Sequence, residues 1–408
     1  MIGLARRVAR RVQKQAIQTL RPAIKVFAPA RLRSVMGVPG GHLFVGYYDI
    51  DPFLEGGAIL AHRVRADDGE AEVGICDFST GAFRPLATTP CWSWQLGARL
   101  QMLDSERLVF NALEDGKPVA QIIGRGGEKM GMFPFNIFSF DAARSRGATL
   151  DFGRLYRHRS GYGYQVLANR KGSGVEAIDR GIGIFDMKRG DFVCAIDVDA
   201  AWDEAVRREI LPAALSEAPR YLNHPLFSAS GEKVAFVLVV DGARARKQAL
   251  MVADAMTGAI LGIMPMQRQA SHFWWVGADV LSVFVSSETG GYAGRYMNWD
   301  IAGNGVRESG PLWPQVDGHQ TNHANKDWWI TDTYPDRHGF QHLYALEESG
   351  RGERILLGRF RATLGMGPNK CDLHPRRSAE GSLAAIDTAY DGYRHIAIID
   401  LNLRKPTG

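Results

Sequence analysis

Two distant stretches of the chain carry one motif, and they read His224-Pro-Leu-Phe-Ser-Ala-Ser-Gly231 and His374-Pro-Arg-Arg-Ser-Ala-Glu-Gly381. Each motif leads into a short apolar run, which begins near Val234 in the first copy and near Ala384 in the second. A Ser/Gly turn before a short apolar run is typical of two strands joined by a tight turn. The motif therefore predicts that the chain repeats one small unit of antiparallel strands.

Two further histidines extend this frame, because His272 and His319 also precede apolar runs. The four histidines follow one another at intervals of 48, 47 and 55 residues. In the last two units an aspartate follows the histidine 13 residues later, at Asp332 and Asp387. The match within the units indicates a true repeat of about 50 residues.

A second recurring element is an Asp followed four residues later by Gly. It occurs at residues 77–81, 186–190 and 254–258. An Asp side chain accepts bonds from backbone N–H groups and Gly supplies a positive φ, so each copy predicts a hairpin turn between the last two strands of a unit. The clearest helical window, residues 201–215, is expected to lie outside the sheets.

Extending the frame towards the N-terminus places three more units, beginning near Tyr47, Trp92 and Asn136. Seven units of this length predict an all-β fold, a seven-bladed β-propeller over residues 41–408. A stacked array that does not close into a ring is the alternative.

The composition agrees with a folded chain that has a large core. Of its 408 residues, 45% are hydrophobic and 10% aromatic. The four cysteines lie far apart and include no C-x-x-C pair, so neither a disulfide framework nor a zinc ribbon is indicated. No run approaches the roughly 18 to 20 apolar residues that a membrane span needs.

The first 35 residues differ from the rest of the chain because they hold nine Lys and Arg and no acid. Residues 1–40 are predicted to form a basic amphipathic N-terminal segment with a short helix, in which apolar residues recur at helical spacing. This segment would dock residues 1–35 on an anionic membrane surface, or form a solvated arm. It lacks the apolar core of a secretory signal, so we expect a cytoplasmic protein, peripheral to the membrane if the segment docks.

The remaining chain holds 40 basic residues (49 − 9) against 44 acidic ones. A mildly acidic body gives no reason to expect binding of nucleic acid.

The histidines of the repeat are candidate metal ligands. The first residue of each unit is expected where the innermost strand faces the axis of the ring, so side chains from neighbouring blades should converge there. His224, His319 and His374, together with Cys371, offer imidazole and thiolate groups, which are the ligands that zinc prefers. The alternative is that each histidine only bonds a neighbouring backbone group. His323 is the substitute if His319 points away, whereas aromatic residues follow His272 and suggest contact with a ligand.

A second group of candidates lies in the third unit. Arg154 can bind a carboxylate through two hydrogen bonds, and Tyr162 and Tyr164, which alternate with glycines, can stand against a sugar ring. The alternative is a loop anchored by buried tyrosines. The candidate substrate-binding residues are Tyr48, Trp94, Gln95, Arg220 and His272. No G-x-S-x-G or H-E-x-x-H motif is present, so a serine hydrolase or a zincin has no support.

These residues resemble the seven-bladed propeller polysaccharide lyases, the ulvan lyase and oligogalacturonate lyase families. The matching segments are residues 46–49, 52–53, 154, 160–164, 222–225, 318–319, 331–336, 372–375 and 386–387. The resemblance implies an axial groove that holds an acidic, uronate-containing polysaccharide or oligosaccharide, and β-elimination assisted by a divalent metal, which we expect to be zinc. Such chemistry requires a neutralised carboxylate, a base and an acid.

The resemblance assigns the arginine of the site to Arg154 and the metal positions to His319, Cys371 and His374, with His224 as a further ligand. It departs from the lyase pattern at Phe138, which stands 16 residues before Arg154, where the ulvan-type enzymes carry a catalytic tyrosine. Histidines expected further upstream are also absent between His62 and His158.

Two hypotheses follow from this departure. Either another group, Tyr162 or Tyr164, supplies the acid and base, or the protein is a non-catalytic propeller. In the second case it would bind a glycan or a protein partner at the inner membrane surface, in polysaccharide biosynthesis.

Overall fold

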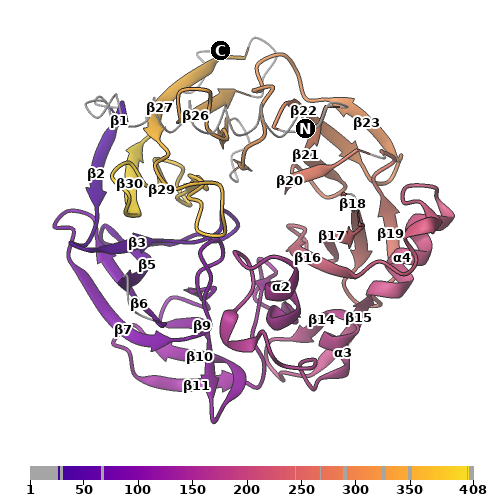
Figure 1. Ribbon diagram of the computed structural model, residues 1–408. Helices are drawn as coiled ribbons and strands as arrows, with labels where there is room; N and C mark the ends of the chain where they lie inside the picture. The colour runs from indigo at the N-terminus through magenta and orange to yellow at the C-terminus, as the bar shows by residue number, and fades with distance from the viewer. Residues whose placement is uncertain are drawn as a thin grey trace.

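Seven antiparallel sheets surround a central axis in the computed structural model (Figure 1). The structure describes residues 26–27, 31–65, 69–243, 245–266, 268–287, 292–322, 328–347, 352–401 and 403. The predicted basic helix and His323 lie outside these residues, so both remain predictions. The seven-bladed β-propeller expected from the repeat is confirmed.

The first three blades are built from consecutive strands of residues 41–197. Blade 1 contains β3 (Gly41–Phe44), β4 (Phe53–Leu54), β5 (Ala58–Arg65), β6 (Ala71–Asp77) and β7 (Phe83–Thr89). Blade 2 contains β8 (Gln101–Met102), β9 (Arg107–Glu114), β10 (Lys117–Gly124) and β11 (Lys129–Phe133). Blade 3 contains β12 (Ser139–Phe140), β13 (Arg146–Leu150), β14 (Gly181–Asp186) and β15 (Phe192–Asp197).

The last four blades follow the histidine frame. Blade 4 contains β16 (Arg220–Phe227), β17 (Lys233–Asp241), β18 (Arg246–Asp254) and β19 (Ile260–Ile263). Blade 5 contains β20 (Ala270–Trp275), β21 (Val280–Ser286), β22 (Gly294–Asp300) and β23 (Gly305–Glu308). Blade 6 contains β24 (Gln320–Asn322), β25 (Trp328–Asp332), β26 (Phe340–Glu347) and β27 (Arg354–Arg361), and blade 7 contains β28 (Arg376–Arg377), β29 (Leu383–Thr388) and β30 (His395–Asp400).

Strands from the N-terminal end of the chain complete the last two blades. β2 (Leu32–Met36) pairs with β30 and becomes the outermost strand of blade 7, and β1 (Val26–Phe27) pairs with β27 of blade 6. Blade 7 would otherwise expose the edge of β30, which β2 covers. The propeller therefore extends into the predicted segment 1–40, and the expected boundary at residue 41 is corrected.

The predicted turns lie where the repeat placed them. Asp77 and Asp254 each accept hydrogen bonds from the backbone N–H groups two and three residues later, at 2.8–2.9 Å. The closing glycines Gly81, Gly190 and Gly258 have φ values of 72°, 78° and 74°. These turns join β6 to β7, β14 to β15 and β18 to β19, which are the last two strands of their blades.

The core lies between the blades, because each sheet packs its faces against its two neighbours. In β17 every residue from Val234 to Val240 is buried, which explains the continuous apolar run of this strand. One cluster of buried residues joins blades 3, 4 and 5.

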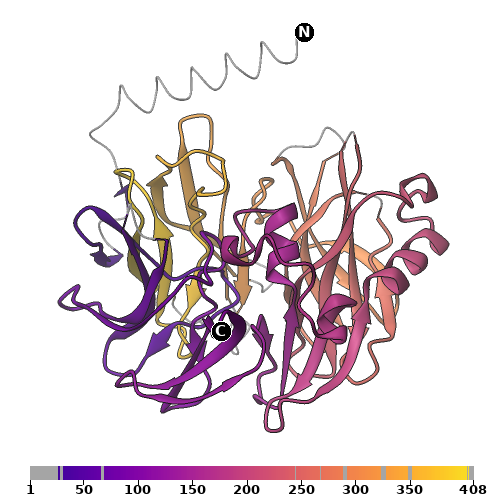
Figure 2. The ribbon, with the colours of Figure 1, turned by 60° about the horizontal axis from the view of Figure 1, so that its bottom comes forward.

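Short helices connect some strands. They are α2 (Phe152–His158), α3 (Glu176–Asp179), α4 (Val198–Arg207), and the 3-10 turns η1 (Gln165–Leu167) and η2 (Ala213–Leu215). α4 lies at the rim of the ring, whereas α2 lies near the axis (Figures 1 and 2). In the described part of the chain, no helix is long and apolar enough to cross a membrane.

The segment between β13 and β14 positions residues close to the axis. It begins at α2, whose N-terminus is capped by Asp151, because the carboxylate accepts bonds from Gly153 N at 2.8 Å and from Arg154 N at 2.9 Å. The loop after α2 then carries the predicted tyrosines, Tyr162 and Tyr164.

Candidate functional site

Histidines in or just before the innermost strands face the axis. His224, His272 and His374 have positive φ values of 54°, 42° and 46°, which are uncommon for residues other than Gly. The pairing register shifts between Asn223 and Leu226 in blade 4, and between Ser271 and Phe273 in blade 5. Such bulges re-aim a side chain out of the regular pleat. The repeat therefore places histidines from several blades at one centre.

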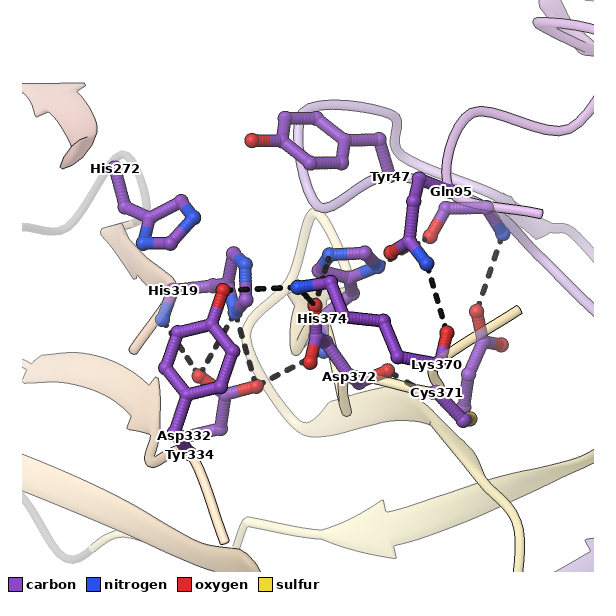
Figure 3. Close-up of polar contacts among 12 residues, drawn as sticks. Tyr47, Gln95, His272, His319, Asp332, Tyr334, Lys370, Cys371, Asp372 and His374 are labelled. Atoms are coloured by element: carbon purple, nitrogen blue, oxygen red, sulfur yellow. Dashed lines mark hydrogen bonds and ion pairs between the residues drawn. The ribbon is translucent and has the colours of Figure 1, made fainter. Parts of the chain in front are cut away.

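Three buried side chains from blades 6 and 7 form a candidate metal centre. The ligand atoms of His319, Asp372 and His374 all lie within 4.8 Å of one another. Figure 3 shows the three side chains directed toward a common point. Two imidazole nitrogens and one carboxylate oxygen are suitable donors for a divalent first-row metal ion.

The other ring nitrogens of both histidines are held by the protein. His319 Nδ1 lies 3.1 Å from each carboxylate oxygen of Asp332, and His374 Nδ1 lies 2.8 Å from the carbonyl oxygen of Gly46. Asp332 also accepts a bond from His374 N at 3.1 Å. Metal-binding histidines are commonly oriented in this way by a carboxylate or carbonyl partner.

The nitrogens that face the cluster lack partners. Among the described residues, Nε2 of His319 and Nε2 of His374 are buried and have no hydrogen-bond partner. Burial, followed by the effect of the neighbouring His319, lowers the pKa of His374 well below its ordinary value, so the His374 imidazole is neutral. A neutral ring with a buried, unpaired nitrogen is the state that binds a metal.

Asp372 supplies the negative charge of the cluster. Its carboxylate pairs with Lys370, whose Nζ also donates to Tyr334 Oη at 2.9 Å. Burial alone would raise the pKa of Asp372, but Lys370 and His319 hold it below its ordinary value. Burial would likewise lower the pKa of Lys370, yet Asp372 raises it to about 12. Asp372 is therefore ionised and Lys370 charged.

Cys371 does not belong to this cluster, although the sequence pattern selected it as a ligand. Its buried thiol lies 3.9 Å from the carbonyl oxygen of Asp372, and burial raises its pKa to about 12. The ligand atoms that come together in blade 7 are those of Asp372 and His374, and the thiol is not among them. The Asp-x-His spacing was the signal that could have identified Asp372.

His224 also stands apart from the candidate metal centre. Its ring stacks on Tyr47 with the centroids 4.6 Å apart, and its Nε2 lies 3.3 Å from Tyr47 Oη. Tyr47 in turn meets His374 edge-on at 4.9 Å between centroids. The tyrosine therefore lies between the two predicted ligands.

A cavity of about 140 Å³ is lined by His272 and Tyr47, whose rings contact those of His319 and His374 in the cluster. Its lining brings together four predicted site residues, Tyr48, Tyr162, His224 and His272. It also includes residues that the sequence did not single out for the site, among them Tyr47, Arg159, Asp317 and Tyr334.

His272 has the environment of a general base. Its Nδ1 lies 2.9 Å from Asp317 Oδ1, and its ring centroid is 3.9 Å from that of His319. The second oxygen of Asp317 accepts a bond from Ser271 Oγ at 2.8 Å. Burial, followed by the effect of His319, lowers the pKa of His272, so the ring is neutral near pH 7 and Asp317 orients it.

The arginine of the cavity is Arg159, not Arg154. The guanidinium carbon of Arg159 stands 4.0 Å from the centroid of the Tyr162 ring, in the cavity wall. Arg154 instead approaches the carbonyl oxygen of Asp179 at 3.4 Å and lines a separate surface hollow. Arg154 lies in the first turn of α2, whereas Arg159 follows the last residue of this helix, so the two side chains leave it at opposite ends.

Other predicted residues have structural partners. The hydroxyl of Tyr164 is buried and accepts a bond from Asn111 Nδ2 at 2.8 Å, which matches the alternative of an anchored loop. Arg220 pairs with Asp199 at 2.8 Å and lines the same hollow as Arg154. Neither residue lines the axial cavity.

Trp94 and Gln95 do not line the axial cavity. Trp94 packs against His42 with the centroids 4.9 Å apart. Gln95 Nε2 donates to the carbonyl oxygen of Lys370 at 2.7 Å, a contact drawn in Figure 3. Gln95 therefore holds the segment that carries Lys370 and Asp372.

Phe138 lies close to the cavity, with its ring centroid 6.0 Å from that of His224. It is fully buried, and its carbonyl oxygen accepts a bond from Arg99 Nε at 2.7 Å.

Comparisons with known proteins agree with the fold. No family model matches the chain, and no curated protein does. Among solved structures, the chain is similar to an oligogalacturonate lyase in complex with manganese, at 13% identity and a TM-score of 0.60, over 89% of this chain and 91% of that one. It is also similar to the oligogalacturonate lyase of Vibrio parahaemolyticus, at 10% identity and a TM-score of 0.56, over 90% of this chain and 92% of that one. At such low sequence identity, the structural similarity shows a shared propeller fold.

Proposed function

We propose that the protein is a metal-assisted lyase that binds a uronate-containing glycan at the axial cavity and cleaves it by β-elimination. The observation that carries this proposal is the position of the candidate metal centre beside the His272–Asp317 pair. An acidic oligosaccharide as ligand also agrees with the oligogalacturonate lyases that share the fold.

His319, Asp372 and His374 would hold a divalent cation. A set of two imidazoles and one carboxylate, without thiolate, suits manganese as well as zinc, and one propeller of the same fold was solved with manganese. A bound cation would draw charge from the uronate carboxylate and so make the neighbouring C–H group more acidic.

The residues of the cavity account for the remaining requirements. Arg159 contributes positive charge that can face the uronate carboxylate. His272, oriented by Asp317, takes the proton from the carbon next to the carboxylate. The double bond then forms as the glycosidic C–O bond breaks.

Tyr47 is the proposed proton donor to the leaving oxygen. Burial, followed by the effect of Tyr48, raises the pKa of Tyr47 well above its ordinary value, so the phenol keeps its proton until the oxygen leaves. His224 Nε2, which is 3.3 Å from the hydroxyl, holds the phenol in place. The phenolate regains a proton from water after the reaction, as the proton taken up by His272 returns to water. Tyr47 thereby supplies the function that Phe138 lacks.

The test is the ultraviolet absorbance of unsaturated uronate, followed on a panel of acidic polysaccharides with added Mn²⁺ or Zn²⁺. We expect the signal with the wild-type protein and its loss in His272→Ala. The matched control is His395→Ala, because His395 Nε2 makes a similar bond to Asp391 at 2.8 Å outside the cavity. Unchanged activity of His272→Ala would exclude it as the base.

One contact favours a second candidate, a propeller that binds a uronate without cleaving it. Asp372 forms an ion pair with Lys370, and the lysine would compete with a metal ion for this carboxylate. In that role residues 1–35 would hold the protein at an anionic membrane surface. Uronate binding by calorimetry without any absorbance change on the panel would support this candidate over the lyase.

A further inference from the structure

A larger hollow adjoins the small axial cavity. The axial cavity measures about 140 Å³, which is less than the roughly 300–1,000 Å³ of ordinary ligand sites. The neighbouring hollow measures about 720 Å³ and is lined by β18, by the segment before β20 and by residues that follow α4. We call this hollow the blade 4–5 groove. A ligand seated in the axial cavity has room for further residues only outside that cavity.

The two spaces share walls. Gln248 on β18 and Gln269 before β20 line both the axial cavity and the blade 4–5 groove. Gln248 Nε2 donates to the carbonyl oxygen of Ala270, which ties the two blades together at this point. α4 lies at the rim of the ring (Figure 1), so the groove leads from the axis toward the rim. The amide side chains at the junction are suited to bond sugar hydroxyl groups.

The groove carries positive charge. Arg246, Lys247 and Arg268 line it, and among its described lining residues Glu209 is the single acid. Arg246 is held in place by Asp241, at 2.7 Å from its Nε, and by the carbonyl oxygen of His158, at 3.2 Å from its Nη2. Its side chain remains 40% exposed, so a fixed guanidinium faces the solvent of the groove.

Part of the lining of the groove is apolar. It consists of Val206, Ile210, Leu211 and Pro212, which follow or end α4. A sugar ring offers C–H groups on its faces and hydroxyl or carboxylate groups at its edge, so it can contact both the apolar and the charged lining residues. No described lining residue of the groove is aromatic, whereas single-stranded nucleic acids are usually held by stacking on aromatic side chains.

We propose that the blade 4–5 groove binds the flanking residues of an extended acidic glycan whose reacting uronate lies in the axial cavity. This inference rests on the proposed function and adds the substrate length: the ligand is an oligomer or polymer of acidic sugars, not a dimer. Lys247 and Arg268 bind carboxylates of the flanking residues, and Gln248 and Gln269 lie where the chain passes from groove to cavity.

The test compares uronate oligomers of two and six residues, prepared from polygalacturonate and from polyglucuronate, by calorimetry on the full chain. We expect the wild-type protein to bind the hexamer of one series more tightly than its dimer. The double variant Lys247→Glu/Arg268→Glu should bind that hexamer about tenfold more weakly and the dimer unchanged.

The control is Lys188→Glu/Arg189→Glu, an equal change of charge in the β14–β15 turn. This turn joins the last two strands of blade 3, whereas Lys247 stands beside the β17–β18 turn at the opposite end of its blade. The control variant should bind the hexamer as tightly as the wild-type protein does. In the groove variant Lys247→Glu/Arg268→Glu, an unchanged affinity for the dimer would show that the axial cavity is intact.

Equal affinity of the wild-type protein for dimer and hexamer would overturn the groove proposal and leave the axial function standing. An unaltered preference for the hexamer in the groove variant would do the same, as would an oligonucleotide of equal charge that displaces the hexamer. Failure of the wild-type protein to bind any uronate oligomer would overturn both proposals.

Discussion

The late and early blades use the same place in the repeat for different purposes. His374 and Arg99 both have positive φ, 46° and 55°, and both stand two residues before the innermost strand of their blade. His374 presents an unpaired Nε2 to the candidate metal centre. Arg99 instead donates hydrogen bonds within the protein, two of 2.8 Å to the carboxylate of Asp49 and one of 2.7 Å to the carbonyl oxygen of Phe138. A position near the axis therefore becomes a site only where its partners leave one polar atom free.

Removing the buried arginine should have the largest effect on stability. In Arg99→Met the carboxylate of Asp49 loses both bonds while it stays buried, so we expect the free energy of unfolding to fall by about 3–5 kcal/mol. Urea denaturation of the variant measures this change. Arg189→Met, an arginine that is 66% exposed, is the control and should change stability by less than about 0.5 kcal/mol. If the free energy of unfolding of Arg99→Met fell by less than about 1 kcal/mol, this would contradict a structural role for Arg99 in the early blades.

Acid should destabilise blade 1 through His62. This histidine is buried, its Nε2 accepts a bond from Ala98 N at 2.9 Å, and burial lowers its pKa to about 4. Because the unfolded chain binds the proton more readily, the stability that His62 provides is complete above about pH 6.5 and is lost as the pH falls toward 4. The loss due to His62 should reach about 3 kcal/mol.

Unfolding of the wild-type protein and of His62→Gln between pH 7 and pH 4 measures this contribution, because the variant lacks the titrating group. Parallel loss of stability in both proteins would show that His62 is not the group responsible.

In the late blades, loss of a residue that supports the candidate metal centre should lower the affinity for the metal. Asp332 holds His319 through Nδ1, so Asp332→Asn should weaken the affinity for Mn²⁺ or Zn²⁺ about 10- to 100-fold. Competition with a chromophoric chelator measures the affinity. The control is Asp336→Asn, because Asp336 makes a similar contact to His342 at 3.1 Å outside the cluster. Equal affinities for the two variants would remove Asp332 from the support of the metal centre.

The smallest effect is expected at Cys371. The thiol is protonated and directed away from the cluster, so Cys371→Ala should leave metal affinity unchanged and lower the free energy of unfolding by about 1 kcal/mol. The same chelator competition applies. A clear loss of metal affinity would restore Cys371 as a ligand.

The architecture was predictable because it depends on features that recur along the chain. The histidine intervals located blades 4 to 7, the Asp-to-Gly turns marked the outer strands of blades 1, 3 and 4, and the frame could be extended to seven units. The sequence did not reveal that residues 32–36 complete blade 7, because a single outer strand resembles any other short apolar segment. Its pairing with β30 joins the two ends of the chain and leaves no local signal.

The site was predicted less completely because it depends on side-chain direction. The convergence of His319 and His374 followed from the repeat, but the choice between Cys371 and Asp372 depended on which neighbour faces the axis. The prediction of Arg154 failed for the same reason, because the arginine that lines the axial cavity is Arg159, the residue after α2. His272 was expected to contact a ligand, yet its partner Asp317 belongs to the next blade and has no spacing that identifies it.

If histidines of blades 6 and 7 hold a divalent cation at the axis, the ion can be detected in the purified protein. The most direct measurement is the metal content of the purified protein after loading with Mn²⁺ or Zn²⁺ and desalting, compared with that of His319→Ala/His374→Ala. We expect one ion per chain in the wild-type protein and none in the double variant, with both proteins folded by circular dichroism. An equal metal content in the two proteins, or no metal in the folded wild-type protein, would contradict this expectation.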